Sequence, residues 1–588
     1  MNLPGPRMET RDETPPENLP APRKMTGIGN SHLKVTATRA AQRWFDQGLN
    51  LLHDFWDYES ARAFEQSVRA DPRCAMCYWG LYKAESFFHG NAQDYAGPAL
   101  AKAVSLKSRA SKRERLYIEA SAAYEDSLKN GARAPGSWPD VALWRQLVKE
   151  YPKDRQARIF LAARVDRREA VALWQAILKD APDDSAANHY YIHALEAGAH
   201  PEQALESAEK LGRLAPASGH MVHMPGHIFF RLGDYARAEQ AFAASLQVDE
   251  RYMREQHVDP DNDWNYVHNL MYAIANLMEE GKLEQATELS GKLTGARGEL
   301  ESTLYIYSTR DSISRLDARL PVALRTADWA RVLKLAQDHA PITGRPNLDF
   351  LARQIAAFAA GMQAIETGDL RRAEESSSRF DEEIARMAQQ LKDSLEMRAG
   401  GRGAPVGPPK LRIRPDALPG PLLSTLSVMS AELRGSVLAA QGKPSEAKGL
   451  FAKAAQEEKE LGYREPPSYI RPVGETEGAA MLAAGDWAAA RTAYQQALQE
   501  RPRSGFALYG MAASSEKAGD WAAAGKEYAD FLAAWKNADP ILPQLAHARA
   551  YLAGHPLDHG ALHRGGRGEG GRAVFPLTRV IARAHEME

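Results

Sequence analysis

One pattern of small and large residues recurs along the chain and limits the folds that it can adopt. The segments 233–250 (GDYARAEQAFAASLQVDE) and 485–502 (GDWAAARTAYQQALQERP) both carry it. A glycine comes first, an aromatic residue follows two positions later, then an alanine, and then a second aromatic residue. Small residues let two helices approach closely, and large residues fill the space beside them. The pattern therefore predicts antiparallel helix pairs, each of which must bury an apolar face against the next pair.

Copies of this pattern occur from the start of the chain to its end. The residues that anchor the clearest copies are Trp44, Gly48, Phe64, Pro72, Gly226, Gly233, Tyr235, Ala238, Phe242, Gly435, Gly442, Phe451, Gly478, Gly485, Trp487, Ala490, Tyr494, Gly519, Trp521 and Tyr528. They resemble the tetratricopeptide repeat (TPR), a helix pair of about 34 residues. We therefore predict an all-α fold, a TPR-like α-solenoid whose concave groove is lined by the first helix of each pair. The pattern is irregular at 90–160 and 296–350, so we do not predict an unbroken array.

Segments of unusual composition divide the predicted array. Residues 1–37 are charged and rich in proline, and we expect them to be disordered. Helical repeats should fill 38–398, which includes the histidine-rich groove, and 422–555. The Gly/Pro-rich stretch 399–421 is typical of a loop or linker. The tail 556–588 is rich in glycine, arginine and histidine and should be disordered.

Overall charge and hydropathy exclude several classes of protein. A net charge of -2 and a pI near 6.8 provide no electrostatic basis for binding nucleic acid. No apolar run approaches the roughly 18 residues of a membrane-spanning helix. No secretory signal is visible at the N-terminus, so we expect a cytoplasmic protein.

The only two cysteines are Cys74 and Cys77, in the sequence CAMC. Two cysteines cannot form a disulfide framework. A single CxxC is weak evidence for a redox or metal site. We interpret the pair as two small apolar side chains near the start of a helix.

A closer resemblance covers most of the chain. The stretches that carry it are AQRWFDQGLNLLHDF, DPRCAMCYWG, NHYYIHALEAGAHPEQAL, GHMVHMPGHIFFRLGDY and YREPPSYIRPVGETEGAAMLAAGDW. They look like a family of large bacterial TPR proteins. That family is largely uncharacterised, so the resemblance implies a fold and no particular activity.

Six histidines and one glutamate lie on three successive predicted helices in the middle of the chain. They are His189, His193, Glu196, His220, His223, His227 and His268. Spacings of three and four residues place side chains on one face of a helix. In the repeat frame, all seven fall at positions that TPR domains use to hold ligands, and none falls at a packing position. We expect the histidines to surround one concave pocket, with Glu196 at its edge.

The residue types in this cluster favour a transition metal. Neutral imidazole suits Zn, Cu and Fe, whereas Mg and Ca prefer oxygen ligands. Six imidazoles exceed one tetrahedral site, so either two ions bind or some histidines orient the others. Glu196 would be a ligand or a general base. Four flanking residues would orient the histidines or contact a ligand: Tyr190, Tyr191, Tyr266 and Asn269.

Two classes of function remain open. The first is a binding scaffold whose groove holds a peptide, a protein or a small molecule, with a metal at its centre. The second is a metal-dependent enzyme, either a Cu or Fe oxidoreductase or a Zn hydrolase. The histidines could instead be structural, or form a polar groove for peptide carboxylates. We find no Gly-rich phosphate loop, no GxSxG motif and no recognisable triad.

Overall fold

The computed structural model describes residues 14–88, 94–129, 138–260, 263–297, 309–338, 341–400 and 416–555. Within these ranges all regular structure is helical, and no strand occurs. The first fourteen α-helices are α1 (Arg39–His53), α2 (Asp57–Ala70), α3 (Ala75–Phe88), α4 (Ala96–Ser105), α5 (Lys112–Lys129), α6 (Pro139–Glu150), α7 (Arg155–Ala162), α8 (Arg167–Asp180), α9 (Ser185–Glu196), α10 (Leu205–Leu214), α11 (Gly219–Arg231), α12 (Tyr235–Gln256), α13 (Trp264–Glu279) and α14 (Leu283–Arg297). The remaining twelve are α15 (Thr309–Leu316), α16 (Leu320–Arg325), α17 (Trp329–Gln337), α18 (Pro346–Glu366), α19 (Leu370–Gly400), α20 (Pro419–Ala440), α21 (Pro444–Glu460), α22 (Val473–Ala483), α23 (Trp487–Glu500), α24 (Gly505–Lys517), α25 (Trp521–Ala534) and α26 (Pro543–Gly554). The prediction of an all-α, TPR-like solenoid is confirmed.

Glycines face aromatic rings across the helix pairs. A Cβ atom at Gly48 of α1 would lie 2.9 Å from the Phe64 ring, and one at Gly80 of α3 would lie 2.2 Å from it. Near the other end of the array, a Cβ atom at Gly510 of α24 would lie 2.2 Å from the Tyr494 ring. A larger residue would need the ring to move, so each glycine sets how closely its helices approach. The small and large residues of the sequence pattern therefore pack against each other.

A glycine and an aspartate form the turn within a helix pair. Gly485 ends the turn after α22 in the left-handed conformation, with φ of 81°. Asp486 then accepts a hydrogen bond from the backbone N–H of Ala489 at 3.1 Å and caps α23. Asp234 and Asp520 cap α12 and α25 in the same way. These turns fix where the second helix of each pair begins.

The segment that precedes α1 differs from the disorder expected for residues 1–37. From residue 14 onward it lies against the array, and the side chain of Leu33 is buried. The backbone N–H of Asn30 donates to the Ser185 hydroxyl at 3.1 Å, and the backbone N–H of Ser185 donates to the Asn30 side chain at 3.0 Å. The segment is an extended strap. An extended strap has no helical periodicity, so composition alone suggested disorder.

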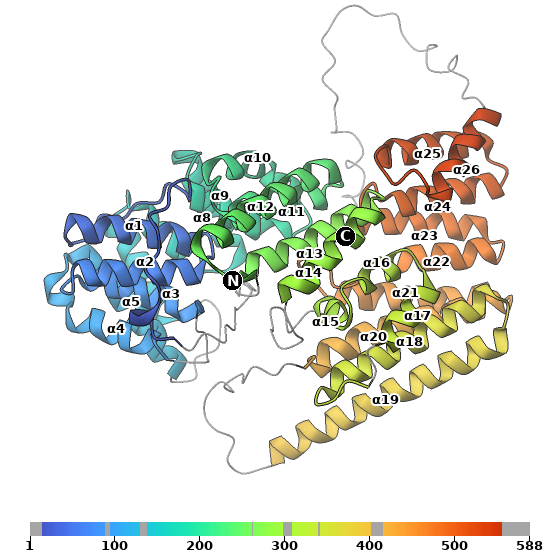
Figure 1. Ribbon diagram of the computed structural model, residues 1–588, viewed down its shortest axis with the longest axis horizontal. Helices are drawn as coiled ribbons and strands as arrows, with labels where there is room; N and C mark the ends of the chain where they lie inside the picture. The colour runs from blue at the N-terminus through green and yellow to red at the C-terminus, as the bar shows by residue number, and fades with distance from the viewer. Residues whose placement is uncertain are drawn as a thin grey trace, which may run out of the picture.

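The C-terminal repeats pack back against the central helices (Figure 1). Helices α13 and α14 lie between the N-terminal repeats and the C-terminal ones. The indole N–H of Trp535 donates to the backbone carbonyl of Glu279 at 2.9 Å. The buried guanidinium of Arg325 lies 2.9 Å from the Glu279 carboxylate and 2.5 Å from that of Glu475. These contacts join the two halves of the array through groups that water does not reach.

Two segments expected to lack regular structure fall mainly outside the described residues. Residues 401–415 make up most of the expected linker at 399–421, and the described chain resumes shortly before α20. The expected disordered tail at 556–588 lies outside as well. The other segment boundaries stay predictions.

The two cysteines form a disulfide bond, which corrects our interpretation of them as separate apolar side chains. Cys74 and Cys77 have Cα atoms 5.3 Å apart, at the beginning of α3. Both side chains are buried. A helix start brings residues three apart to the same side, which places the two sulfur atoms within bonding reach.

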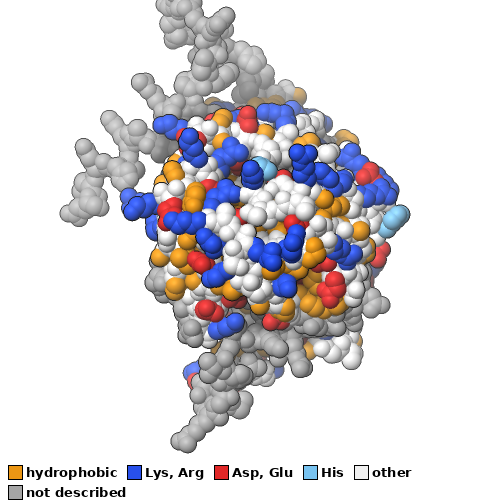
Figure 2. Space-filling view, turned by 90° about the vertical axis from the view of Figure 1, so that its left-hand side faces the viewer, with side chains coloured by type: hydrophobic (Ala, Val, Ile, Leu, Met, Phe, Trp, Pro, Cys, Tyr) orange, Lys and Arg blue, Asp and Glu red, His pale blue; other side chains and the backbone are white. Residues whose placement is uncertain are grey.

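The described helices include none that is long and apolar enough to cross a membrane. Figure 2 views the end of the molecule that lies at the left of Figure 1. Lysine and arginine side chains gather there in several groups, with acidic and apolar side chains between them. This end of the molecule therefore carries positive and negative charges among apolar side chains, and not charges of one sign only.

Candidate functional site

Three helices carry the seven predicted site residues, and each begins at a side-chain cap. Asp184 caps α9, Ser218 caps α11 and Asp263 caps α13, each by accepting hydrogen bonds from backbone N–H groups in the first turn. The caps fix the first turn of each helix. The three- and four-residue spacings then place the site residues on one face of each helix.

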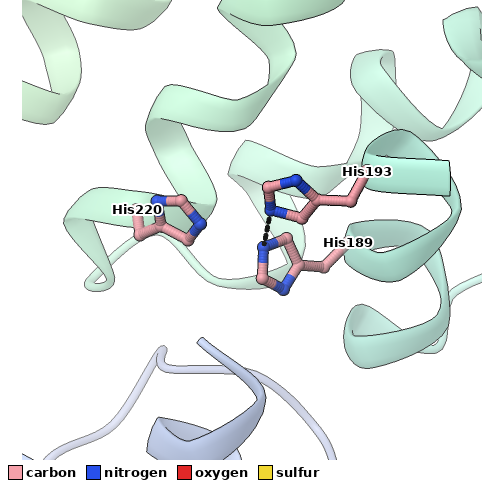
Figure 3. Close-up of side chains that lie close together, drawn as sticks. All are labelled: His189, His193 and His220. Carbon is pink, nitrogen blue, oxygen red and sulfur yellow. Dashed lines mark hydrogen bonds between the residues drawn. The ribbon is translucent and has the colours of Figure 1, made fainter. Parts of the chain in front are cut away.

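The first histidine set consists of His189, His193 and His220. The first two project from α9 and the third from the start of α11, and the three rings lie close together (Figure 3). One ring nitrogen from each lies within 4.8 Å of the others. The Nε2 atoms of His189 and His193 are 3.1 Å apart. His189 and His220 are buried, whereas the His193 side chain is 9% exposed.

The second histidine set consists of His223, His227 and His268. His223 and His227 lie four residues apart on α11, and His268 lies on α13. The Nε2 atom of His223 is 2.6 Å from that of His227 and 3.0 Å from that of His268. All three side chains are buried. The structure therefore divides the six predicted histidines into two groups of three.

The outer nitrogens of three histidines face oxygens that can only accept hydrogen bonds. Nδ1 of His189 lies 2.6 Å from the backbone carbonyl of His53. Nδ1 of His193 and Nδ1 of His227 each lie 2.6 Å from a different carboxylate oxygen of Glu196. We assign a proton to each of these Nδ1 atoms. In the neutral ring, Nε2 then carries a lone pair.

Two asparagines also accept a hydrogen bond from Nδ1 of a histidine, which leaves the lone pair of that ring on Nε2. Nδ1 of His220 lies 3.1 Å from the amide oxygen of Asn265, whose NH₂ group donates to Asp249 at 2.7 Å. Nδ1 of His223 lies 2.6 Å from the amide oxygen of Asn269, whose NH₂ group donates to a backbone carbonyl. Each amide oxygen therefore accepts from Nδ1. The predicted neighbour Asn269 orients a histidine, as such outer partners do in metal sites.

Glu196 lies between the two histidine sets and not at the edge of a pocket. Its side chain is buried, and its two oxygens accept hydrogen bonds from His193 of the first set and His227 of the second. Burial opposes its ionisation, but the two imidazoles hold the pKa of Glu196 well below its usual value. Because both oxygens are engaged, this carboxylate orients two histidines and is poorly placed to act as a base.

Burial favours the neutral form of five of the six histidines. It lowers the pKa of each of five members of the two sets, and neighbouring histidines lower it further: His189, His220, His223, His227 and His268. For His227 the Glu196 carboxylate opposes this effect. Neutral imidazole is the form that binds transition metals.

The three tyrosines predicted to flank the site are Tyr190, Tyr191 and Tyr266. The ring of Tyr190 stacks on Trp174 with centroids 5.1 Å apart. The hydroxyl of Tyr191 accepts from Gln175 at 3.1 Å, and that of Tyr266 donates to Glu250 at 3.2 Å. The hydroxyl of Tyr190 lies 3.2 Å from Nδ1 of His53, and its ring centroid is 5.4 Å from that of His189. We therefore assign the three tyrosines to packing around the site.

Phe55 is a site residue that the sequence did not reveal. It lies between α1 and α2, and its φ of 58° is in the left-handed region that non-glycine residues rarely adopt. Its ring centroid is 4.7 Å from that of His189, 5.3 Å from His193 and 5.6 Å from His220. An apolar ring therefore covers the first histidine set.

Glu465 is the second residue that the sequence analysis missed. It lies in the loop between α21 and α22, and its side chain is 18% exposed. Its Oε2 atom is 3.9 Å from Nδ1 of His227 and 3.9 Å from Nε2 of His268. Burial, followed by the negative charge of Glu196, raises the pKa of Glu465. The C-terminal half of the chain thus contributes a carboxylate to the histidine site.

Comparisons with known proteins return solved structures and no family. No family model matches the chain, and no curated protein matches it. Among solved structures, "Crystal structure of APC/C hetero-tetramer Cut9-Hcn1" matches with 13% identity and a TM-score of 0.23, covering 77% of this chain and 98% of that one. "Structure of Naa15/Naa10 bound to HypK-THB" matches with 16% identity and a TM-score of 0.24, covering 75% of this chain and 66% of that one. At these scores the overall shapes do not superimpose, so our argument rests on the helix pairs and the site itself.

Proposed function

We propose that this TPR-like protein is a metalloprotein that binds two transition-metal ions, one in each histidine set. The main observation behind the proposal is the distance of 2.6 Å between the Nε2 atoms of His223 and His227. Both histidines donate from Nδ1, to Asn269 and Glu196 respectively. Two lone pairs then face each other in a buried site. A cation bound by both nitrogens would move them apart to roughly 3.3–3.4 Å and convert this repulsion into attraction.

A shared proton is the other way to relieve this repulsion. Burial lowers the pKa of both His223 and His227, which disfavours an imidazolium at neutral pH. A proton also satisfies only two nitrogens, whereas Nε2 of His268 completes a group of three. A metal ion contacts all three nitrogens at once. Three imidazoles suit Zn, Cu or Fe.

The burial of the histidines also bears on the peptide-groove alternative. A peptide carboxylate would have to reach side chains such as His189 and His268, which are 0% and 1% exposed. A metal ion needs only the space within one histidine set, whereas a peptide needs an open path to the rings. We therefore place metal binding first and keep a peptide, protein or small-molecule partner elsewhere on the concave face as the second candidate. Catalysis by a Cu or Fe oxidoreductase or a Zn hydrolase would require the metal centre.

The test is the metal content of protein made without a polyhistidine tag in metal-replete medium. We expect two ions per chain in the wild type. The variants His193→Ala and His227→Ala should each retain about one, because each removes a ligand from a different set. His200→Ala is the control, since His200 is exposed and pairs with Glu202 outside both sets.

A wild type without metal would contradict the proposal, as would a full load in both histidine variants. The identity of the metal then separates the remaining functions. Stoichiometric Cu or Fe favours redox chemistry, and Zn favours hydrolysis or a structural role.

A further inference from the structure

The two histidine sets differ in their exposure. In the second set, His223 and His227 are 0% exposed and His268 is 1% exposed. In the first set, the His193 side chain is 9% exposed, and the covering residue Phe55 is itself only partly buried. His193 is therefore the one histidine of the two sets with a side chain that is not fully buried.

Glu465 lies beside the second set, near Nε2 of His268. Two donor atoms on one tetrahedral ion lie roughly 3.3–3.4 Å apart, since each is about 2.0–2.1 Å from the metal. The Oε2 atom of Glu465 lies 3.9 Å from Nε2 of His268 and 3.9 Å from Nδ1 of His227, the outer nitrogen of that ring. The carboxylate must therefore turn towards the centre of the set to reach this spacing from all three Nε2 atoms. Glutamate completes a three-histidine site with a donor that transition metals accept.

The loop around Glu465 is held on both sides by partly buried contacts. The guanidinium of Arg310 donates to the backbone carbonyl of Pro467 at 2.8 Å. On the other side of Glu465, the hydroxyl of Tyr463 lies 3.5 Å from that of Tyr272, whose ring lies 4.4 Å from the ring of His227. These contacts hold the loop next to the second set.

The first set has an apolar ring where the second has a carboxylate. Within the described part of the chain, the only metal-binding side chains that converge with His189 and His220 are histidines. His193 also lies near Glu465 and Glu196, but it meets Glu196 through Nδ1, the nitrogen on the outer side of its ring. The ring of Phe55 faces all three histidines of the set.

The remaining donor of the first set is aimed into its centre. Nε2 of His220 is buried and has no hydrogen-bond partner among the described residues. Its Nδ1 is engaged with Asn265, so the lone pair on Nε2 is the free donor of this ring. The three rings of the set face one another (Figure 3). Three imidazoles without a fourth protein ligand are typical of a site that keeps one position open.

We propose that the two sites are unequal, an inference that rests on the metal-binding function proposed above. In the second site, the three histidines and Glu465 fill all four positions. In the first site, the three histidines leave one position open to a small exogenous ligand, either water or an anion such as azide. This ligand enters past Phe55 and His193. The first site is therefore where this protein binds a small substrate.

The test is the number of azide ions bound by the full-length protein loaded with Co(II). Azide binding is followed by calorimetry and by the visible absorption of Co(II). We expect one azide for every two cobalt ions in the wild type and two in Glu465→Ala, because removing the carboxylate opens the second site. Glu460→Ala is the matched control and should bind one, since Glu460 lies at the end of α21 with its side chain exposed.

Two azides or none in the wild type would overturn the inference, as would one azide in a folded, fully loaded Glu465→Ala variant. If Glu465→Ala does not fold, Glu465→Gln gives the same readout, because a neutral amide is a much weaker ligand than a carboxylate. Cobalt loading is measured in the same samples. Failure of the wild type to bind two cobalt ions would contradict the metal-binding function itself, whereas two ions with the wrong azide count would contradict only the inequality of the sites.

Discussion

Gly226 and Phe242 are in direct contact: a Cβ atom at Gly226 would lie 2.3 Å from Cε1 of the Phe242 ring. Gly226 precedes His227 on α11, and Phe242 lies on α12. The Phe242 ring is also 4.9 Å from the ring of His223. The contact that sets the spacing of this helix pair therefore also supports the second histidine set.

Replacement of Gly226 by leucine should destabilise the protein. The new side chain would overlap the Phe242 ring, and overpacking of this kind costs about 1–3 kcal/mol. Urea denaturation monitored by circular dichroism measures the change. The control is Gly449→Ala in α21, where a Cβ atom meets nothing within 4 Å, so its midpoint should not fall. An unchanged midpoint for Gly226→Leu would show that the helix pair is not packed as described.

Replacement of Glu196 by glutamine should weaken one metal site and spare the other. The carboxylate accepts from both His193 and His227, whereas an amide has one accepting oxygen and one donating NH₂ group. The histidine that meets the NH₂ group must move its proton to Nε2, and so loses the lone pair that binds metal. We expect one tight site to remain and the other to weaken by about 10–100-fold. Metal titration by calorimetry measures both.

The matched control for this experiment is Glu202→Gln. Glu202 pairs with His200 on the surface, with its side chain 53% exposed. Both metal sites should keep their affinity in this variant. Two undiminished sites in Glu196→Gln would show that the carboxylate does not orient the histidines.

His53 should make the protein less stable as the pH falls. Burial lowers the pKa of His53 from 6.5 to about 4, although a hydrogen bond to Gln156 opposes the shift. Between these values the unfolded chain binds the proton and the folded protein does not, so the free energy of unfolding decreases with falling pH. The decrease stops below the folded pKa and amounts to about 3 kcal/mol.

The variant His53→Gln isolates this effect, because all other titrating groups are present in both proteins. The stability advantage of the wild type over the variant should shrink by about 3 kcal/mol between pH 7 and pH 4. Urea denaturation of the metal-free proteins at several pH values provides the measurement. A difference that does not change with pH would mean that the pKa of His53 is the same in the folded and the unfolded chain.

Arg325 should be essential for the junction between the two halves. Its guanidinium is buried between Glu279 and Glu475. The variant Arg325→Met removes the cation that the two buried carboxylates share and leaves, among the described residues, only Arg501, at 3.9 Å from Glu279. We expect a cost of about 3–5 kcal/mol. Limited proteolysis and urea denaturation report the loss. Arg371→Met, which breaks an exposed pair with Glu375, should change stability by less than about 1 kcal/mol. Equal effects of the two substitutions would contradict the role of the buried pair.

Local spacing explains how much of this structure could be predicted. The glycine and aromatic positions predicted the helix pairs, because their packing partners lie within one repeat, as Gly226 and Phe242 do. The same spacing predicted which histidines share a helical face. The spacing did not predict that the histidines form two groups of three, with Glu196 hydrogen-bonded to both. That arrangement depends on how the three helices are rotated against one another. That rotation leaves no pattern in the sequence.

The contributions of Phe55 and Glu465 could not be predicted for a different reason. Each comes from a turn or loop far from the histidine helices in sequence, and periodicity does not show which loop packs against which face. The bond between Cys74 and Cys77 was missed because a short CxxC segment is compatible with both bonded and separate side chains. The extended strap before α1 was missed because its buried residues, such as Leu33, follow no period.

The order of synthesis follows from the position of Glu465 in the chain. His268 is the last histidine of the two sets, and the ribosome must add 197 further residues (465 − 268) before Glu465 is made. At about 5–20 residues per second, this interval lasts roughly 10–40 s. During that time the three histidine helices have emerged, but the loop that covers them has not. We expect ions to enter first in this interval, before the last repeats dock, so that the metal supply during translation determines which ion the protein contains at first.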